Sequence, residues 1–288
     1  MTSAEIDLYR AILARRSVRR YERTPLAQAE LARVYEAIAA ARPLIAANDY
    51  RVLLRDLPAA SDLTAALGAY GRIANPPHVL VPYVLGDRHP LVELGFRTEQ
   101  IAVRLTALGL GSCFIGCLGR EAQVRARFQL PPSARLAALL VFGRPSGATA
   151  ARAVNRLVRE ITGATRKLPA DRIFFDGDFS RPAAPPADLA PLIEAARHAP
   201  SAVDAQPWRF LWRGGILHLF VKRWNPRYGP GDGQSYRLHD GGVCMGNVAL
   251  ALEALGRRGS WNVYEGDDPD LPEHPESLMP LAHLEIDR

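Results

Sequence analysis

The sequence predicts an α+β protein made of two degenerate copies of one unit. Three segments of the first half recur in the same order in the second: residues 31–38 as 189–196, 50–53 as 208–211, and 105–109 as 252–256. Each copy spans about 150 residues, an ordinary domain size. Within each copy, helical and strand patterns are mixed without the strict alternation that builds a parallel doubly wound sheet. Each unit is therefore expected to hold an antiparallel-rich mixed sheet with packed helices.

The first copy opens with a helix over residues 4–14, where Thr2 and Glu5 have capping-box spacing. Residues 15–24 show no period and are expected to be extended or irregular. A helix over 29–41, a strand near 50–54, a short helix near 60–69 and a strand near 78–85 follow. Pro82 lacks a backbone N–H, so it should push that strand toward a sheet edge or a bulge. A helix over 93–108 and strands at 112–116 and 136–142 complete the copy.

The second copy repeats this order. A helix over 188–198 precedes a strand at 208–213, and Gly214-Gly215 predicts a tight hairpin turn into a strand at 216–222. A helix over 241–256 and strands at 259–264 and 281–287 follow. Between the copies lie a helical stretch around 151–161 and a proline-rich segment that ends at 181–186. We place the unit boundary in this connector, giving units 1–165 and 166–288, and expect the connector to wrap the surface.

Composition indicates an ordinary globular protein. The chain has 288 residues, of which 48% are hydrophobic and 23% charged, so it can bury a large core. Its net charge of +6 comes almost entirely from arginine, since lysine occurs only at Lys167 and Lys222. These cations are spread along the chain rather than gathered in a basic run. A nucleic-acid partner is therefore not expected.

The N-terminal residues lack the pattern of a signal peptide, and no apolar run is long enough to span a membrane. The three cysteines, Cys113, Cys117 and Cys244, are an odd count in a large chain, which favours a reducing cytoplasm over a disulfide framework. No further cysteines or nearby histidines complete a zinc site around Cys113 and Cys117. We interpret all three as small core residues and expect no metal.

Two separated segments have the character of one binding site. Residues 15–19 place three arginines and a serine within five positions, a chemistry suited to phosphate oxygens. Residues 199–208 form a compact run of small and amide side chains before Trp208. A solvated basic face is the other interpretation of the first segment. We expect Trp208 itself to be a core residue that begins a strand.

These two segments, together with Pro25 and the glycine-rich residues 109–116, resemble the FMN-dependent nitroreductase family, and specifically a tandem branch in which two units are fused. The resemblance covers nearly the whole chain. It implies that FMN lies between two units, which in the ordinary family are two subunits of an obligatory homodimer. The arginine-serine motif and residues 109–116 would come from the first unit and residues 199–208 from the second, across a pseudo-twofold axis.

The resemblance also implies the role of each residue. Arg15, Ser17, Arg19 and one of Arg166 or Lys167 would bind the phosphate. Ser201, Ala202 and Gln206 would line the ribityl chain and the ring edge, and backbone N–H groups around Ile115 and Gly116 would face flavin N5. The implied cofactor site comprises Arg15, Arg16, Ser17, Arg19, Ile115, Gly116, Arg166, Lys167, Pro200, Ser201, Ala202, Asp204 and Gln206.

The reciprocal site has degenerated, because residues 166–169 make a poor arginine-serine motif and residues 41–44 lack the serine. The expectation is one FMN per chain, in a monomer that acts as its own dimer. The implied activity moves hydride from NAD(P)H through FMN to a small electron-poor acceptor, such as a nitroaromatic or a quinone. It needs no catalytic side chain, because flavin N5 performs the chemistry. The alternative is a flavin-binding or flavin-sequestering protein without efficient turnover.

The sequence departs from the family pattern in two respects. Asp204 stands where an asparagine is usual, and a carboxylate near reduced flavin opposes its anionic form unless it is paired or turned away. No asparagine and lysine pair follows the middle helix of the first copy. In addition, the glycine- and proline-rich residues 225–234 either cover the ring as a substrate gate or form a passive surface loop.

Overall fold

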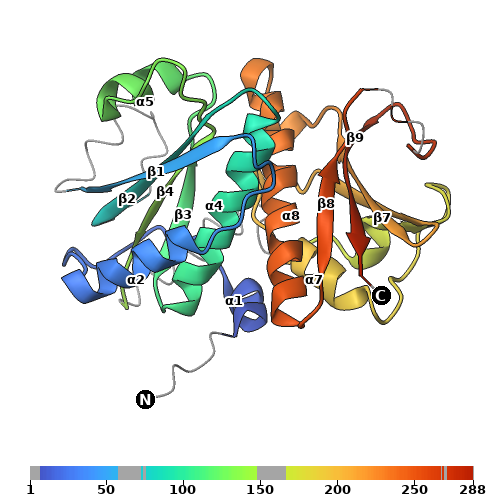
Figure 1. Ribbon diagram of the computed structural model, residues 1–288, viewed down its shortest axis with the longest axis horizontal. Coiled ribbons are helices and arrows are strands. Elements are labelled where there is room, and N and C mark those ends of the chain that lie inside the picture. The colour runs from blue at the N-terminus through green and yellow to red at the C-terminus, as the bar shows by residue number, and fades with distance from the viewer. Residues whose placement is uncertain are drawn as a thin grey trace.

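The computed structural model describes residues 7–57, 73, 76–147, 167–266, 268 and 271–287. Within these ranges each half of the chain forms one β-sheet, and two long helices stand side by side between the sheets (Figure 1). These helices are α4 (Pro90–Ala107) from the first half and α8 (Tyr236–Ala254) from the second. The arrangement confirms the predicted α+β class.

The first sheet is antiparallel in the order β1-β2-β4-β3. Its strands are β1 (Asp49–Asp56), β2 (His78–Leu85), β3 (Gly111–Gly116) and β4 (Ala138–Gly143). Every residue of β4 is buried, as expected for an uninterrupted apolar run inside a sheet. The short helices α2 (Gln28–Ala39) and α5 (Glu121–Phe128) contribute Val34 and Val124 to the cores on this sheet.

The second sheet has the order β5-β6-β7-β9-β8. Its strands are β5 (Phe174–Asp176), β6 (Trp208–Arg213), β7 (Ile216–Lys222), β8 (Gly259–Val263) and β9 (Leu278–Ile286). β6-β7-β9-β8 repeats the order β1-β2-β4-β3, so both units have the same antiparallel core. β5 adds a parallel edge next to β6. Apart from β5, the two sheets thus share one strand order.

The two central helices approach each other closely at glycines. A Cβ on Gly95 of α4 would lie 2.1 Å from the carbonyl oxygen of His239, and a Cβ on Gly242 of α8 would lie 2.1 Å from the carbonyl oxygen of Val92. The repeat that relates residues 105–109 to 252–256 also relates these two contacts to each other. The contact is therefore reciprocal, as at the isologous interface of a dimer.

Two further helices, α1 (Leu8–Ala14) and α7 (Ala190–His198), connect the two halves of the described chain. α1 packs with α7 and with both central helices. Ile12 of α1 is fully buried, and the Tyr9 hydroxyl donates a 3.0 Å hydrogen bond to the carbonyl oxygen of Pro191. The arginine-serine motif, which follows α1 directly, therefore starts at the boundary between the units.

Most predicted elements are found within a few residues of their expected bounds. α8 begins at Tyr236, five residues before the predicted start, and α5 was not predicted. Gly214 and Gly215 have φ of +61° and +83°, so the predicted hairpin turn is confirmed. The predicted helices near 60–69 and around 151–161 lie outside the described residues.

The expectation for Pro82 was wrong in part, because β2 is an inner strand between β1 and β4. Its ladder with β4 covers only residues 78–80, whereas its ladder with β1 runs on through Pro82. Pro82 thus lies where β2 has lost one of its two neighbours. The missing N–H does not interrupt the ladder with β4.

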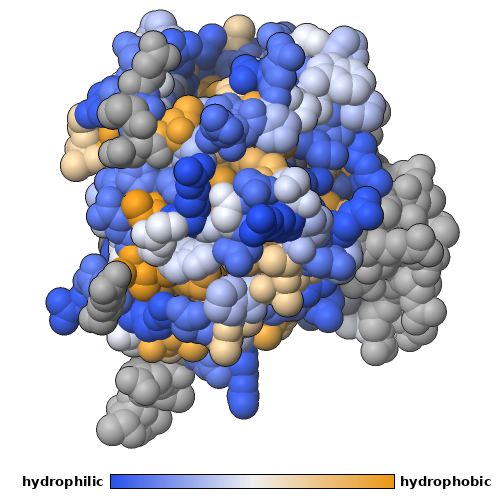
Figure 2. All heavy atoms as spheres, turned by 90° about the vertical axis from the view of Figure 1, so that its right-hand side faces the viewer, coloured by the Kyte–Doolittle hydropathy of each residue, from blue (hydrophilic) through white to orange (hydrophobic). Residues whose placement is uncertain are grey.

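The three cysteines are buried and free, as expected for core residues. Trp208 is fully buried. Among the described helices none is long and apolar enough to cross a membrane. Figure 2 shows the face of the second unit, where hydrophilic residues cover most of the surface and hydrophobic residues form smaller patches between them.

Candidate functional site

The arginine-serine motif lies along the free edge of the first sheet. Ser17 forms an isolated parallel bridge with Ser112 of β3, and the N–H of Val18 donates to the carbonyl oxygen of Ser112 at 2.9 Å. Gly111 makes room for this approach, since a Cβ there would lie 2.6 Å from the Val18 side chain. Ser17 and Val18 are thus held along β3 as an added edge segment rather than as a loose loop.

The motif's arginines have different environments. Burial raises the pKa of the Cys113 thiol on β3, and Arg19 and Arg15 oppose that shift, so both guanidinium groups lie near this thiol. Arg15 is buried, and Arg19 is half-buried with one long 3.4 Å hydrogen bond to the carbonyl oxygen of Ser17. Arg16 is exposed and donates to the carbonyl oxygen of Ala14. The motif therefore directs two of its three cations toward β3.

The backbone of β3 presents one of the two predicted N–H groups at this edge. Cys117 N–H donates to the Ala137 carbonyl oxygen, and in an antiparallel ladder hydrogen-bonded pairs alternate, so Ile115 and Leu139 form the next such pair. The N–H of Ile115 is therefore hydrogen-bonded to β4 within the sheet. The N–H of Gly116 points away from β4, toward the free edge.

The turn after α7 is strained and held from several sides. Val203, Asp204 and Gln206 have φ of +49°, +53° and +44°, a left-handed conformation that is uncommon for residues with a Cβ. The N–H of Ala202 donates to Asp240 Oδ2 at 2.9 Å. Such strain persists where the surroundings fix it, and it concentrates at functional sites.

Residues 225–234 supply part of that support. Arg227 Nη1 donates to the carbonyl oxygens of Val203 and Asp204 at 3.2 and 2.9 Å, and Asn225 Nδ2 donates to that of Ala205 at 3.2 Å. Gln234 closes the loop with hydrogen bonds to the backbone of Asn225 in both directions. The loop therefore holds the turn in place through hydrogen bonds and is not a passive surface segment.

The side chains of the turn bond to one another and to the connector. Gln206 Nε2 donates to Asp204 Oδ2 at 3.2 Å, and Gln206 Oε1 accepts from the N–H of Leu168 at 2.9 Å. Ser201 Oγ accepts from the N–H of Gln206 at 3.0 Å. Burial raises the pKa of Asp204, against the opposing effects of Lys167, Arg227 and Gln206. The carboxylate that departs from the family pattern is thus a paired one.

Lys167 joins the turn to the arginine motif. Its Nζ donates to the carbonyl oxygen of Ala199 at 2.7 Å and lies 3.9 Å from Asp204 Oδ1. Burial lowers the pKa of Lys167 to about 8, Asp204 and Glu99 raise it, and Arg15 lowers it further. Residues from the start, the middle and the second half of the chain therefore meet around one lysine. Arg166 lies outside the described residues.

The remaining predicted residues have limited exposure but no direct side-chain role in this network. Pro200 and Ala202 are half-buried within the turn. Only the backbone of Ala202 takes part, through its bond to Asp240.

Four residues of the site were missed by the sequence analysis. Glu99 forms a buried ion pair with Arg15, with 3.2 Å between Arg15 Nε and Glu99 Oε1. On α8, Asp240 holds the strained turn, and the Tyr236 hydroxyl accepts from the N–H of Leu118 at 3.1 Å. His239 packs edge-on against Phe114 of β3, with ring centroids 5.7 Å apart.

A signal for Asp240 was present in the repeat. It occupies the position of Glu93 in the first copy, and Glu93 Oε2 accepts from the N–H groups of Leu44 and Ile45 in the turn after α2. That reciprocal turn also bonds Arg42 to Gln100 through the Arg42 backbone. Both turns are closed by a carboxylate from a central helix, but among the described residues an arginine-serine motif lies beside the second turn alone.

A cavity of about 550 Å³ lies between the units near this site. It borders Leu118, which follows Gly116 in the chain, and Ser235 and Leu238 at the start of α8. Acidic Asp87 and basic Arg125 both reach its wall. Its size suits a small organic molecule.

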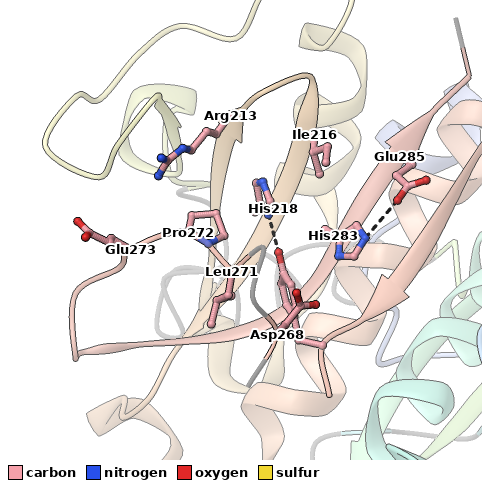
Figure 3. A pocket seen from close by; sticks show the side chains of 10 residues that line it. Arg213, Ile216, His218, Asp268, Leu271, Pro272, Glu273, His283 and Glu285 are labelled. Carbon is pink, nitrogen blue, oxygen red and sulfur yellow. Dashed lines mark hydrogen bonds and ion pairs between the residues drawn. The ribbon is translucent and has the colours of Figure 1, made fainter. Parts of the chain in front are cut away.

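A second cavity, of about 710 Å³, lies in the second unit away from these residues (Figure 3). His218 of β7 and His283 of β9 are neighbours across the sheet, and His218 Nδ1 lies 2.5 Å from the Tyr264 hydroxyl. Arg213 and Glu273 point away from these rings. Among the described residues no three histidine, cysteine or acidic side chains are placed to hold a metal ion.

The buried His218 in this cavity predicts that the fold loses stability in acid. Burial, with a smaller contribution from His283, lowers the pKa of His218 from 6.5 to about 4. The unfolded chain then binds more protons than the folded one between these values, so stability falls as the pH drops from about 6.5 to 4. In chemical denaturation across this range, His218→Gln should show a smaller decline than the wild type. Equal declines in the two proteins would contradict the assignment.

A family model described as "Putative TM nitroreductase" matches residues 7–228. A "putative nitroreductase" from Thermotoga maritima is similar in structure, with a TM-score of 0.57, 19% identity, and coverage of 99% of this chain and 95% of that one. No curated protein matches the sequence.

Shorter solved structures match about half of the chain. An FMN-dependent nitroreductase from Clostridium difficile has a TM-score of 0.43 and 17% identity over 48% of this chain and 88% of its own. Nitroreductase A from Vibrio parahaemolyticus has a TM-score of 0.42 and 19% identity over 49% and 69%. The family match covers most of the sequence and confirms the resemblance carried by its motifs: the chain belongs to this nitroreductase family.

Proposed function

We propose that the protein is an FMN-dependent oxidoreductase that takes hydride from NADH or NADPH and gives it to a small electron-poor acceptor of the nitroaromatic or quinone type. The observation that carries this proposal is the meeting of Arg15 and Lys167 with the strained turn of the second unit. Family membership supports an oxidoreductase, and one structurally similar protein is described as an FMN-dependent nitroreductase.

The phosphate end of the site suits FMN. Arg15 Nε and Nη1 are buried and make no hydrogen bond within the described residues. Buried guanidinium donors without acceptors are costly, and a phosphate supplies acceptors in the matching geometry. Arg19 and Ser17, which act with Arg15 on the Cys113 thiol, and Lys167, which is electrostatically coupled to Arg15, would complete a phosphate site of two guanidinium groups, one ammonium and one hydroxyl.

Other residues would position the rest of the cofactor. The turn at 200–206 is pre-organised by Asp240 and Arg227, so it would meet the ribityl chain without reordering. The Gly116 N–H faces the open edge of β3, where it can donate to a ring nitrogen. FMN would supply hydride transfer at N5. The cavity next to Leu118 would admit the nicotinamide and then the acceptor.

The same residues support one site per chain. The second turn has an arginine-serine partner, whereas the turn after α2 is closed on Glu93 and Gln100. We therefore propose a monomer that acts as its own dimer in the cytoplasm, with units 1–165 and 166–288 and without a nucleic-acid or membrane partner.

Rapid mixing tests the activity. Holo-protein mixed without oxygen with NADH, and separately with NADPH, should lose its oxidised-flavin absorbance within seconds, and a nitroaromatic or quinone should then restore it. A flavin that stays oxidised with both nicotinamides would overturn the oxidoreductase proposal.

A second candidate is a flavin-binding or flavin-sequestering protein without efficient turnover. One observation favours it: a Cβ on Gly116 would lie 2.1 Å from the Tyr236 hydroxyl, so this side chain packs against the strand where the ring is expected. Tyr236→Phe separates the two. If NADH or NADPH reduces FMN slowly and at the same rate in the wild type and in Tyr236→Phe, and both proteins bind FMN tightly, the sequestration function is favoured.

A further inference from the structure

Glu99 is an acid buried inside the proposed phosphate site. It lies in the middle of α4, its side chain is 0% exposed, and that of Arg15 is 4% exposed. Neither carboxylate oxygen of Glu99 makes a hydrogen bond within the described residues, although Oε1 lies 3.2 Å from Arg15 Nε. The pair is thus held by charge with little hydrogen bonding.

The charged groups around Glu99 come from several elements. Arg15 follows α1, and Lys167 comes from the connector. The thiol of Cys244 faces it from α8, and Asp204 on the turn after α7 faces Lys167. In the part of the chain that the structure describes, no other charged group interacts electrostatically with Glu99.

Two ion pairs occupy this site before any ligand binds. Arg15 is matched by Glu99 and Lys167 by Asp204, which leaves Arg19 as the remaining cation of the proposed phosphate site. A phosphate monoester would bring about two further negative charges into this buried space at neutral pH. A carboxylate left ionised beside it would repel it at low dielectric. Taking a proton removes that repulsion and frees the Arg15 donors.

We propose that Glu99 is the resident counter-ion of Arg15 and that it releases Arg15 to the FMN phosphate by taking up a proton from solvent. The inference rests on the proposed function, because it requires FMN to bind here. One proton moves from water to a Glu99 oxygen, Arg15 stays protonated, and no covalent bond to the ligand forms. Glu99 thereby makes binding of the phosphate-bearing flavin depend on pH.

The environment of Glu99 puts this exchange in the working range. Burial raises its pKa to about 7, and Arg15 and Lys167 oppose the shift. At pH 8 the need to protonate Glu99 before FMN binds would then weaken FMN binding by about tenfold, relative to a protein whose side chain at this position needs no proton. Riboflavin, which has the same ring and no phosphate, needs no such exchange.

Titration calorimetry of the full chain tests the proposal. FMN is titrated at pH 7.5 and 8 in two buffers of different ionisation enthalpy, into wild type, Glu99→Gln and Glu93→Gln. Wild type and Glu93→Gln should take up clearly more protons per FMN than Glu99→Gln, which should bind FMN at least about tenfold more tightly than wild type at pH 8. Lys167 and the phosphate titrate in all three proteins, so the difference between proteins is the measure.

Glu93→Gln is the matched control, since Glu93 is a buried acid on the same helix that faces the other turn. If Glu99→Gln fails to fold, infrared difference spectra of the wild type replace it. FMN, and not riboflavin, should then produce a protonated carboxyl band. Equal proton uptake in wild type and Glu99→Gln, or no such band, overturns the role of Glu99 while FMN binding stands. No FMN binding by either protein would overturn both proposals.

Discussion

Arg19→Ala should weaken FMN binding by roughly tenfold to a hundredfold, with little loss of stability. A charge-assisted hydrogen bond contributes about 1.5–3 kcal/mol, which corresponds to that range of affinity. Within the described residues Arg19 makes one long hydrogen bond of its own, to the carbonyl oxygen of Ser17, so its removal leaves no buried hydrogen-bond partner unsatisfied there. Arg15 is a poorer choice for the test, because removing it would leave Glu99 buried without its counter-ion.

The measurement is quenching of flavin fluorescence during titration with protein. Arg23→Ala is the matched control, because Arg23 is exposed, lies four residues further on, and changes the net charge equally. The control should keep wild-type affinity. Equal affinities in Arg19→Ala and wild type would remove the phosphate assignment from this motif.

Gly242→Ala should destabilise the fold by about 3 kcal/mol. The added methyl would lie 2.1 Å from the carbonyl oxygen of Val92 and 3.0 Å from the N–H nitrogen of Phe96, so α4 and α8 must separate. Overpacking a well-packed core costs about 1–3 kcal/mol and occasionally more. A contact with backbone belongs at the upper end, because backbone cannot rotate away. The loss exceeds the gain of about 1 kcal/mol in helix propensity.

Gly241→Ala supplies the control for this prediction. It has the same change in propensity on the same helix, but its methyl would meet the end of the Leu281 side chain, which can change rotamer. Chemical denaturation should give a much lower midpoint for Gly242→Ala than for Gly241→Ala. Equal midpoints would show that the close approach of the two central helices is not needed.

The elements with a clear period were predictable from sequence, and those formed by tertiary contacts were not. β6 and β7 were predicted with their observed bounds, since apolar alternation and the Gly214-Gly215 turn determine both. α5 was missed because half of its residues are polar and it buries little more than Val124 and Phe128. The inner position of β2 depends on β4, which lies some 60 residues away, and no local pattern reports it.

The site shows the same division. Arg15, Ser17 and Arg19 stand out because their residue types cluster in the sequence. Glu99 does not, because α4 also carries Glu93, Arg97 and Arg104, so another acid there has no local signature, and its importance comes from Arg15, far away in the chain. Ile115 and Gly116 differ in role because hydrogen-bonded and non-hydrogen-bonded pairs alternate along β3 and β4. Only the register of the two strands determines which residue belongs to which kind of pair.

One flavin is expected to bind between the two units of a single chain. The most direct test is the absorbance spectrum of the purified protein after saturation with FMN and desalting, read against protein concentration, with the native mass measured in parallel. One FMN per monomeric chain is the predicted result. Two per chain would mean that the turn closed on Glu93 and Gln100 also binds FMN. A protein that retains none would contradict the claim.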